Sequence, residues 1–378
     1  MKTEQNKFNQ DKPKFIQFAI VCEIEGNVNA DESVGTRTTI KKFITREGIY
    51  PYVSSRAIKK GIKNALVKEG YSIDPFERLI RDTAADSGNF IKYIDQDLFG
   101  FMVPVENGVK RKAPVEISYL VSFYPIPITT EFAGRFSRKH NPVPYEIEQA
   151  KFVGRFYGII YNYIGVFHES EVISDEYIKD DLEKAEKNGK IIKEDKFYYL
   201  EPEERKNRLR ALLKILLTGS FTLPRSTNQL NQGNYKYVIV ALTKSIKPLP
   251  AFVNIKHEKE REYEIIREEK DGKIIEKVIE RFNEGYTLDI EKIKELAKML
   301  DDEEVIYIID YVGDIKEDYF KDVKNTTQSD KVKVKVVKPS NITNMLDEII
   351  GNREKKIDGK IDLMNLDYYK KFYEFDKE

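Results

Sequence analysis

Apolar side chains gather in short runs along the chain, and their spacing predicts a mixture of strands and helices. Residues 15–25 (FIQFAIVCEIE) are apolar and rich in β-formers, which predicts a buried strand. After Ser54 and Ser55 the apolar residues recur at helical spacing, which predicts a capped helix that ends near Gly70. The apolar face of this helix consists of Ile58, Ile62, Ala65 and Leu66.

The clearest helix spans residues 201–218, with Pro202 at its first position and a leucine-rich stripe that ends at Gly219. The charged stretch 174–195 is expected to be a solvated insertion. Strands are predicted at 97–103, 115–123, 152–167 and 235–243. Beyond a proline-containing boundary at 244–255, the pattern predicts a hairpin over 254–283 that turns at Asp271-Gly272, a helix over 289–300, strands at 305–309 and 331–338, and a last helix from about 340.

Reduced to its core elements, the part up to residue 245 reads strand–helix–strand–strand–helix–strand. This is the order of a ferredoxin-like, RNA-recognition-motif-like α+β domain, here opened by large insertions. An open sheet face of such a domain can present aromatic rings and cations to single-stranded RNA.

Composition excludes several classes of protein. The 378 residues are 40% hydrophobic and 34% charged, and no apolar run approaches the ~20 residues that a membrane span needs. The polar segment 1–14 lacks a secretory signal, so we expect a cytoplasmic protein without membrane contact. Cys22 is the only cysteine and there are three histidines, so we expect no disulfide, no metal site and no cofactor.

The net charge of zero hides an asymmetry. Residues 1–255 carry 39 Lys and Arg against 32 Asp and Glu, and residues 256–378 carry 25 against 32. A basic N-terminal part and an acidic C-terminal part are consistent with a chain that binds an anion through the first and another protein through the second. An ordinary solvated surface explains the same charges equally well.

Positive charge is densest between Gly35 and Lys63, where Glu47 is the only acid. The cations of the helix lie opposite its apolar face. A helix N-terminus that begins with two serines also favours phosphate binding. We therefore predict that this segment binds single-stranded nucleic acid, RNA for preference, although a solvated helix face is the plain alternative. Its cations are Arg37, Lys41, Lys42, Arg46, Arg56, Lys59, Lys60 and Lys63.

Four strings together resemble one family: YPYVSSRAIKKGIKNAL (50–66), DLFGFM (97–102), APVEISYLVSF (113–123) and NRLRALLKILLTGSFTLPRSTNQL (207–230). The sequence is similar to the backbone subunit of type I CRISPR surveillance (Cascade) complexes, the Cas-seven or DevR-type branch of the RAMP superfamily. The resemblance covers roughly residues 15–250. It implies a crRNA-binding scaffold for antiviral defence, whose partners are the guide crRNA, copies of itself along that RNA, other Cascade subunits, and target DNA through the guide.

The resemblance also implies a hand-shaped molecule. Its palm would be 15–70 with 150–250, its finger insertion 71–149 and its thumb hairpin about 218–236, between an N-terminal tail (1–14) and a charged C-terminal segment (251–378) packed on the palm. The palm cations would be those of the basic segment, with Ser54 and Ser55. The thumb would wedge the RNA with Phe221, Leu223, Arg225, Thr227 and Asn228, and the finger would face RNA with Arg138, Lys139 and His140. Without the resemblance, the residues of the thumb, about 218–236, are more simply interpreted as a flexible polar loop.

Catalysis is not expected. Relatives in type III complexes cut RNA with an acid in the loop after the first strand, and here the acid that should follow the glycine is absent because Gly35 leads into Thr36 and Arg37. The alternative is a ribonuclease, either metal-dependent through the loop around Asp31 or guide-processing through His140 as general acid or base. An autoregulatory RNA- or DNA-binding protein is a third hypothesis.

Overall fold

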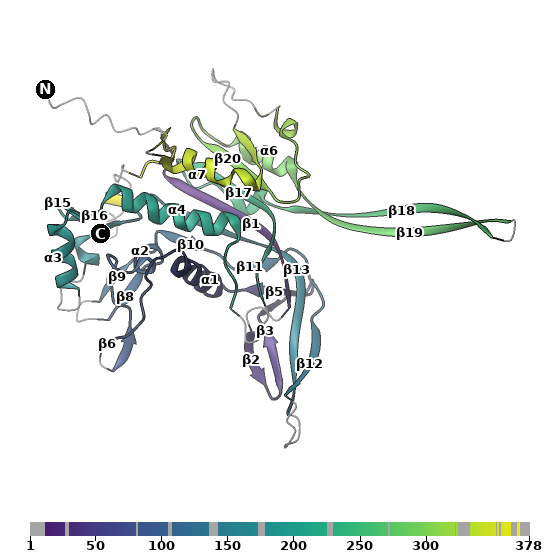
Figure 1. Ribbon diagram of the computed structural model, residues 1–378, viewed down its shortest axis with the longest axis horizontal. Helices are drawn as coiled ribbons and strands as arrows, with labels where there is room; N and C mark the ends of the chain where they lie inside the picture. Colours follow the sequence, from purple (N-terminus) through teal and green to yellow (C-terminus); the bar gives the residue numbers. More distant parts are fainter. Residues whose placement is uncertain are drawn as a thin grey trace.

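The computed structural model describes residues 12–370 except 27–29, 81, 105–107, 136–142, 173–177, 225–229, 271–272, 322, 324–332, 353, 355–356 and 364–368. Its centre is a large sheet whose main path runs β21-β20-β17-β1-β13-β11-β5-β4 (Figure 1). Strand β1 (Phe15–Gly26) lies in the middle and pairs antiparallel with β13 (Val143–Tyr161) and β17 (Asn234–Thr243). The other strands of the sheet are β2 (Ala30–Val34), β3 (Arg37–Ile40), β4 (Lys42–Ile44), β5 (Ile49–Val53), β10 (Val115–Ile117), β11 (Leu120–Ser122), β12 (Thr129–Arg135), β20 (Val305–Asp310) and β21 (Val334–Val337).

Alternate residues of β1 face two separate cores, because successive side chains of a strand point to opposite faces. Phe18 and Ile20 belong to the larger core, which is closed by helices α1 (Ser55–Lys68), α4 (Pro202–Thr218) and α7 (Ile342–Ile350). Ala19 and Val21 belong to the second core, which is closed by α5 (Leu249–Phe252) and α6 (Ile290–Lys298). The sheet therefore separates the side that carries α1 from the side that carries α6.

Smaller units surround this body. The hairpin of β18 (Ile255–Lys270) and β19 (Lys273–Leu288) projects far from the sheet (Figure 1). A satellite core joins Leu182 of α3 to Ile191, Phe90 and Phe167. The remaining elements are β6 (Arg78–Ile80), β7 (Thr83–Ala85), α2 (Ile94–Leu98), β8 (Phe101–Val103), β9 (Val109–Arg111), β14 (Val166–His168), η1 (Glu169–Glu171), α3 (Lys179–Lys187), β15 (Ile191–Glu194), β16 (Phe197–Leu200), η2 (Glu317–Phe320), η3 (Pro339–Asn341), β22 (Gly351–Asn352) and β23 (Ile357–Asp358).

The predicted α+β class is confirmed, as are the first strand, the helix capped by Ser54, the leucine-rich helix and the hairpin after residue 254. The expected hairpin turn at Asp271-Gly272 lies outside the described residues. Several predictions are wrong. The predicted strand over 115–123 is divided into β10 and β11, and the one over 152–167 is broken after Tyr161, where β13 ends, until β14 begins at Val166. The strand over 97–103 is interrupted, because α2 ends at Leu98 and β8 begins only at Phe101. The supposedly solvated stretch 174–195 contains α3, whose Leu182 and Ala185 are buried.

In the part of the chain that the structure describes, every helix is too short or too polar to cross a membrane.

Candidate nucleic-acid interface

The N-terminus of α1 is capped by a serine and carries no acid. The Ser54 hydroxyl caps the helix by accepting a hydrogen bond from the Ala57 amide at 3.3 Å, and the first turn contains no acidic residue. The inner face of α1 is anchored in the core through Ile58 and Ile62. The positive end of the helix dipole therefore lies beside the half-buried Ser54 and Ser55, and such a helix end favours negative charge.

Arg56 and Lys60 are the exposed cations of this helix end. No hydrogen bond or ion pair joins either side chain to another residue that the structure describes. Arg46, in the turn between β4 and β5, is exposed in the same way. Three cations of the basic segment are thus exposed: Arg56 and Lys60 on the first two turns of α1, and Arg46 at the far end of β5.

Lys59 and Lys63 have a different environment from Arg56 and Lys60. Both ammonium groups lie over the ring of Phe99, at 5.5 and 5.9 Å from its centroid, and burial lowers the pKa of Lys59. Lys63 also pairs with the buried carboxylate of Asp95 at 2.7 Å. The prediction that all four helix cations form one almost purely positive stripe pointing away from the core is therefore wrong for these two, because α2 and the residue that follows it pack against them.

Two cations of the preceding strands are likewise paired with acids of β13. Arg37 lies 2.6 Å from Glu146, and Lys42 lies 2.5 Å from Glu148, which also accepts the amide of Ile40. These acids are more than a hundred residues away in the chain, so the sequence of the basic segment gave no sign of them. The predicted residue Lys41 is half-buried.

The predicted thumb is only partly exposed. Phe221 and Leu223 are 8% and 6% exposed and belong to the larger core, so the prediction that they form an open wedge is wrong. Gly61 of α1 explains this burial, because a Cβ there would lie 2.5 Å from the Thr222 carbonyl oxygen. Arg225, Thr227 and Asn228 lie outside the described residues, whereas Leu230 just beyond them is 77% exposed.

The other predicted residues are not tested by the structure. Arg138, Lys139 and His140 lie outside the described residues. Asp31 belongs to β2, but its side chain is outside the described part. Within the described part of the chain, no group of three His, Cys, Asp or Glu could hold a metal ion.

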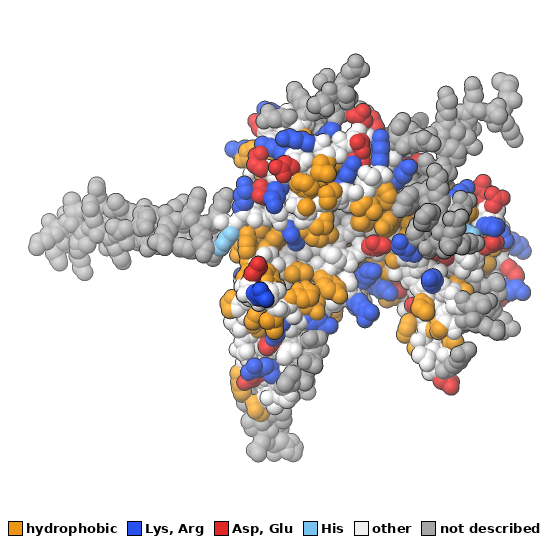
Figure 2. Space-filling model, turned by 180° about the vertical axis from the view of Figure 1, so that it is seen from behind, with side chains coloured by type: hydrophobic (Ala, Val, Ile, Leu, Met, Phe, Trp, Pro, Cys, Tyr) orange, Lys and Arg blue, Asp and Glu red, His pale blue; other side chains and the backbone are white. Residues whose placement is uncertain are grey.

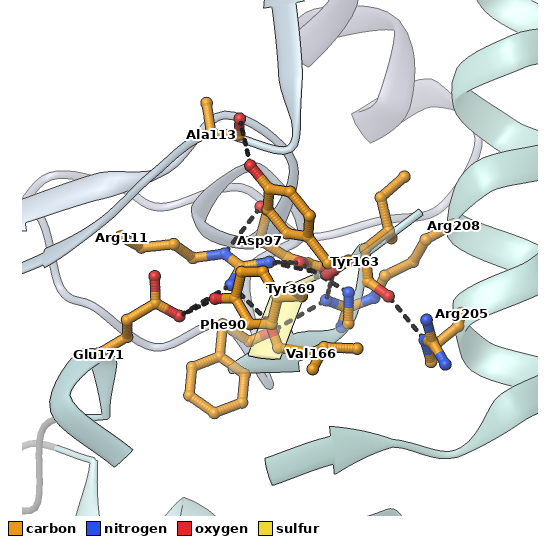
Figure 3. A network of polar contacts seen from close by, with 12 residues as sticks. Phe90, Asp97, Arg111, Ala113, Tyr163, Val166, Glu171, Arg205, Arg208 and Tyr369 are labelled. Carbon is orange, nitrogen blue, oxygen red and sulfur yellow. Dashed lines mark hydrogen bonds and ion pairs between the residues drawn. The ribbon is translucent and has the colours of Figure 1, made fainter. Parts of the chain in front are cut away.

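A cluster of charges that sequence reasoning missed is buried between α2, β9 and α4 (Figure 3). Asp97 of α2 accepts hydrogen bonds from Arg111 at 2.7 Å and from Arg208 of α4 at 3.0 Å. Glu171 accepts from Arg111 at 3.3 Å and from the Tyr369 hydroxyl at 2.6 Å. The cluster thus ties α2, β9, α4 and the C-terminal region together.

The guanidinium groups of this cluster are also held by backbone carbonyls. Arg205 donates to the carbonyl oxygens of Ile164 and Asn162 at 2.7 and 3.0 Å, and burial lowers its pKa to about 10. Burial opposes the charge of Arg111, but the nearby carboxylates of Asp97 and Glu171 outweigh this effect and raise its pKa. Because Arg111 and Asp97 have no exposed side-chain surface, this cluster stabilises the fold and offers no open site.

A family described as "CRISPR-associated negative auto-regulator DevR/Csa2" matches residues 16–264. No curated protein matches the sequence. Among solved structures, a chain of a "CRISPR RNA-guided surveillance complex" is 11% identical, with a TM-score of 0.45 and coverage of 88% of this chain and 98% of that chain. A chain of a "CRISPR RNA-guided surveillance complex, pre-nicking" is also 11% identical, with a TM-score of 0.44 and coverage of 88% and 99%.

Proposed function

Because the chain belongs to the CRISPR-associated DevR/Csa2 family, we propose that it is the guide-RNA-binding backbone subunit of a type I CRISPR surveillance (Cascade) complex. In this role, copies of the chain line up along one crRNA and bind other Cascade subunits. The guide then remains free to pair with target DNA.

The arrangement of the sheet supports a palm of the ferredoxin-like kind. Strands β17-β1-β13-β11 are neighbours in that order, and their pairing is antiparallel throughout. Helices α1 and α4 both pack into the core on one face of these strands. This order corresponds to the strand–helix–strand–strand–helix–strand pattern of the sequence.

The observation that carries the proposal is the exposed positive end of α1. Arg56 and Lys60 lie four residues apart on the first two turns of a capped helix that has no acid in its first turn. Contacts of this kind bind phosphates and fix the position of a strand without reading its bases. A subunit that must accept any guide sequence needs this type of contact.

We further propose that the chain holds RNA without cutting it. The competing hypothesis is a ribonuclease of the same fold that uses Asp31 with a metal ion or His140 as an acid or base. Incubation with complementary RNA and with guide precursor, with and without magnesium, separates the two hypotheses. Cleavage that is lost in the Asp31→Asn or His140→Ala variant contradicts the scaffold proposal.

The direct test is charge reversal at the helix end. We expect the Arg56→Glu/Lys60→Glu variant to lose the RNA that purifies with the wild-type protein. Its thermal stability should not fall, because Glu at position 56 is favourable in the first turn of the helix and the exposed Lys60 has no ion pair with any described residue. Lys68→Glu is the matched control, since Lys68 is exposed on the last turn of the same helix and should retain RNA.

Two results would overturn the proposal. One is a wild-type protein that binds duplex DNA but no single-stranded RNA, as an autoregulator of transcription would. The other is equal RNA retention by the reversed variant and by the wild type.

A further inference from the structure

Three aromatic rings form an exposed stack at the edge of the sheet, on the face opposite α1. The ring of Tyr52 on β5 lies 4.3 Å from that of Phe43 and 5.2 Å from that of Tyr119, with interplanar angles of 16° and 17°. Phe43 and Tyr119 remain 41% and 46% exposed. Large apolar rings that stay this open on a protein surface, already stacked on one another, can accept another flat ring.

The stack continues into a groove on the α6 side of the sheet. This groove has a volume of about 700 Å³ and is lined by Tyr119, Tyr157, Phe123, Arg155 and Lys292, among others. Hydrophobic side chains gather in the middle of the face seen from behind in Figure 2. Hence the second face of the sheet carries an open aromatic surface where α5 and α6 do not cover it.

A guanidinium group is built into this groove. Arg155 lies 4.6 Å from the ring centroid of Phe123 and 5.4 Å from that of Tyr157, and it donates to the Val253 carbonyl and to Asn254. These contacts hold it in a fixed orientation between two rings. Arginine planes and aromatic rings in alternation are a surface on which nucleobases stack.

We propose that Phe43, Tyr52 and Tyr119 form a stacking platform for bases of a single-stranded nucleic acid whose phosphates contact the start of α1. This inference rests on the proposed function, because the same strand is bound in both. It adds a second mode of contact, through bases, to the contact through phosphates.

Two observations favour nucleic acid over another copy of the chain as the occupant. First, the stack is continuous with the basic segment, since Phe43 and Tyr52 lie within it and Tyr52 is two residues before the helix cap Ser54. Second, the charge of the groove is positive. Its acid Asp289 already pairs with Lys256 at 3.3 Å, while Lys292 has no ion pair with any residue that the structure describes.

The test compares two RNA probes of about 12 nucleotides, a length within the usual site size of single-strand binders. One is an oligoadenylate and the other has the same phosphates but several central abasic sites. Since stacking contributes ~1–3 kcal/mol per base, we expect the wild-type protein to bind the oligoadenylate at least about fivefold more tightly. In the Phe43→Leu/Tyr119→Leu variant, which keeps only the Tyr52 ring of the platform, this preference should be clearly reduced.

The controls separate this inference from the proposed function. Phe132→Leu changes a phenylalanine on β12 that is even more exposed, and it should keep the preference for the oligoadenylate. The Arg56→Glu/Lys60→Glu variant should weaken binding of both probes. If the wild-type protein binds both probes with equal affinity, the stacking platform is refuted and the phosphate contact stands.

Two further outcomes also refute the platform. If the wild-type protein binds neither probe, the proposed function fails as well. If Phe43→Leu/Tyr119→Leu alters only the sedimentation of the protein and leaves the preference between probes intact, the surface is a contact between copies. The comparison of probes on the wild-type protein needs no variant, so it remains decisive even if a variant does not fold.

Discussion

The outer end of α1 and the buried cluster around Asp97 use the same kind of side chain in opposite ways. In the buried cluster, Arg111 and Arg208 are each bound to Asp97 and to backbone carbonyls. At the end of α1, Arg56 and Lys60 are exposed and have no partner among the described residues. Positive charge alone therefore does not mark a binding site.

The buried cluster contributes to the free energy of folding, whereas the exposed cations of α1 contribute to the free energy of ligand binding. A buried charge has lost its hydration and must keep its protein partner, so its loss reduces stability. An exposed cation has kept its hydration and contributes little to folding, so its loss affects a ligand instead. The predictions below test this division.

The largest effect is expected at Asp97. Its replacement, Asp97→Asn, removes the charge that faces Arg111 and Arg208 and should lower the free energy of unfolding by about 3–5 kcal/mol in urea denaturation. Asp180→Asn is the control, because this exposed residue of α3 lies 4.0 Å from an equally exposed Lys184 and should change stability little. Similar small losses in both variants would mean that the buried cluster is not structural.

A smaller effect is expected on the inner face of α1. Alanine normally favours a helix over glycine by ~1 kcal/mol, but Gly61→Ala should destabilise the protein by about 1–3 kcal/mol because its Cβ would collide with Thr222 and Phe221. Asn64→Ala, on the exposed side of the same helix, should not destabilise it. If Gly61→Ala instead raises the melting temperature, the segment after α4 is not packed on α1. Phe221 would then be free to contact RNA, as the sequence predicted.

Alkaline pH should weaken the buried interior of the protein. Burial raises the pKa of Cys22 from 9.0 to about 12, so the unfolded chain loses this proton first. The contribution of the thiol to stability is complete below pH 9 and falls above it, by up to ~1.4 kcal/mol per pH unit until about pH 12. In urea denaturation at several pH values, Cys22→Ala should make the decline less steep, whereas an unchanged slope would contradict the burial of the thiol.

Local patterns predicted much of the fold, because periodicity and caps are properties of neighbouring residues. The first strand, the Ser54 cap and the Pro202–Thr218 helix follow from spacing alone. The α2 helix was missed because its five residues are too few to show a helical period. The burial of Leu182 was missed because the charged residues around it suggested a solvated surface.

The candidate site was predicted only in outline, because its charges are paired across long distances in the chain. The basic segment was recognised from composition, but only the structure shows that Glu146 neutralises Arg37 and that Asp95 neutralises Lys63. The aromatic stack was missed for the same reason, since Tyr119 joins Phe43 and Tyr52 only through the pairing of β11 with β5.

The salt dependence of RNA binding tests the central claim, that Arg56 and Lys60 contact phosphates, most directly. The affinity for two single-stranded RNAs of unrelated sequence is measured over a range of salt concentrations. If each cation contacts one phosphate, Arg56→Ala/Lys60→Ala should reduce the slope of log K against log salt by about 1.4, roughly 0.7 per phosphate, for both RNAs, and Lys68→Ala should not. An unchanged slope in the double variant, or a loss confined to one sequence, would contradict the account.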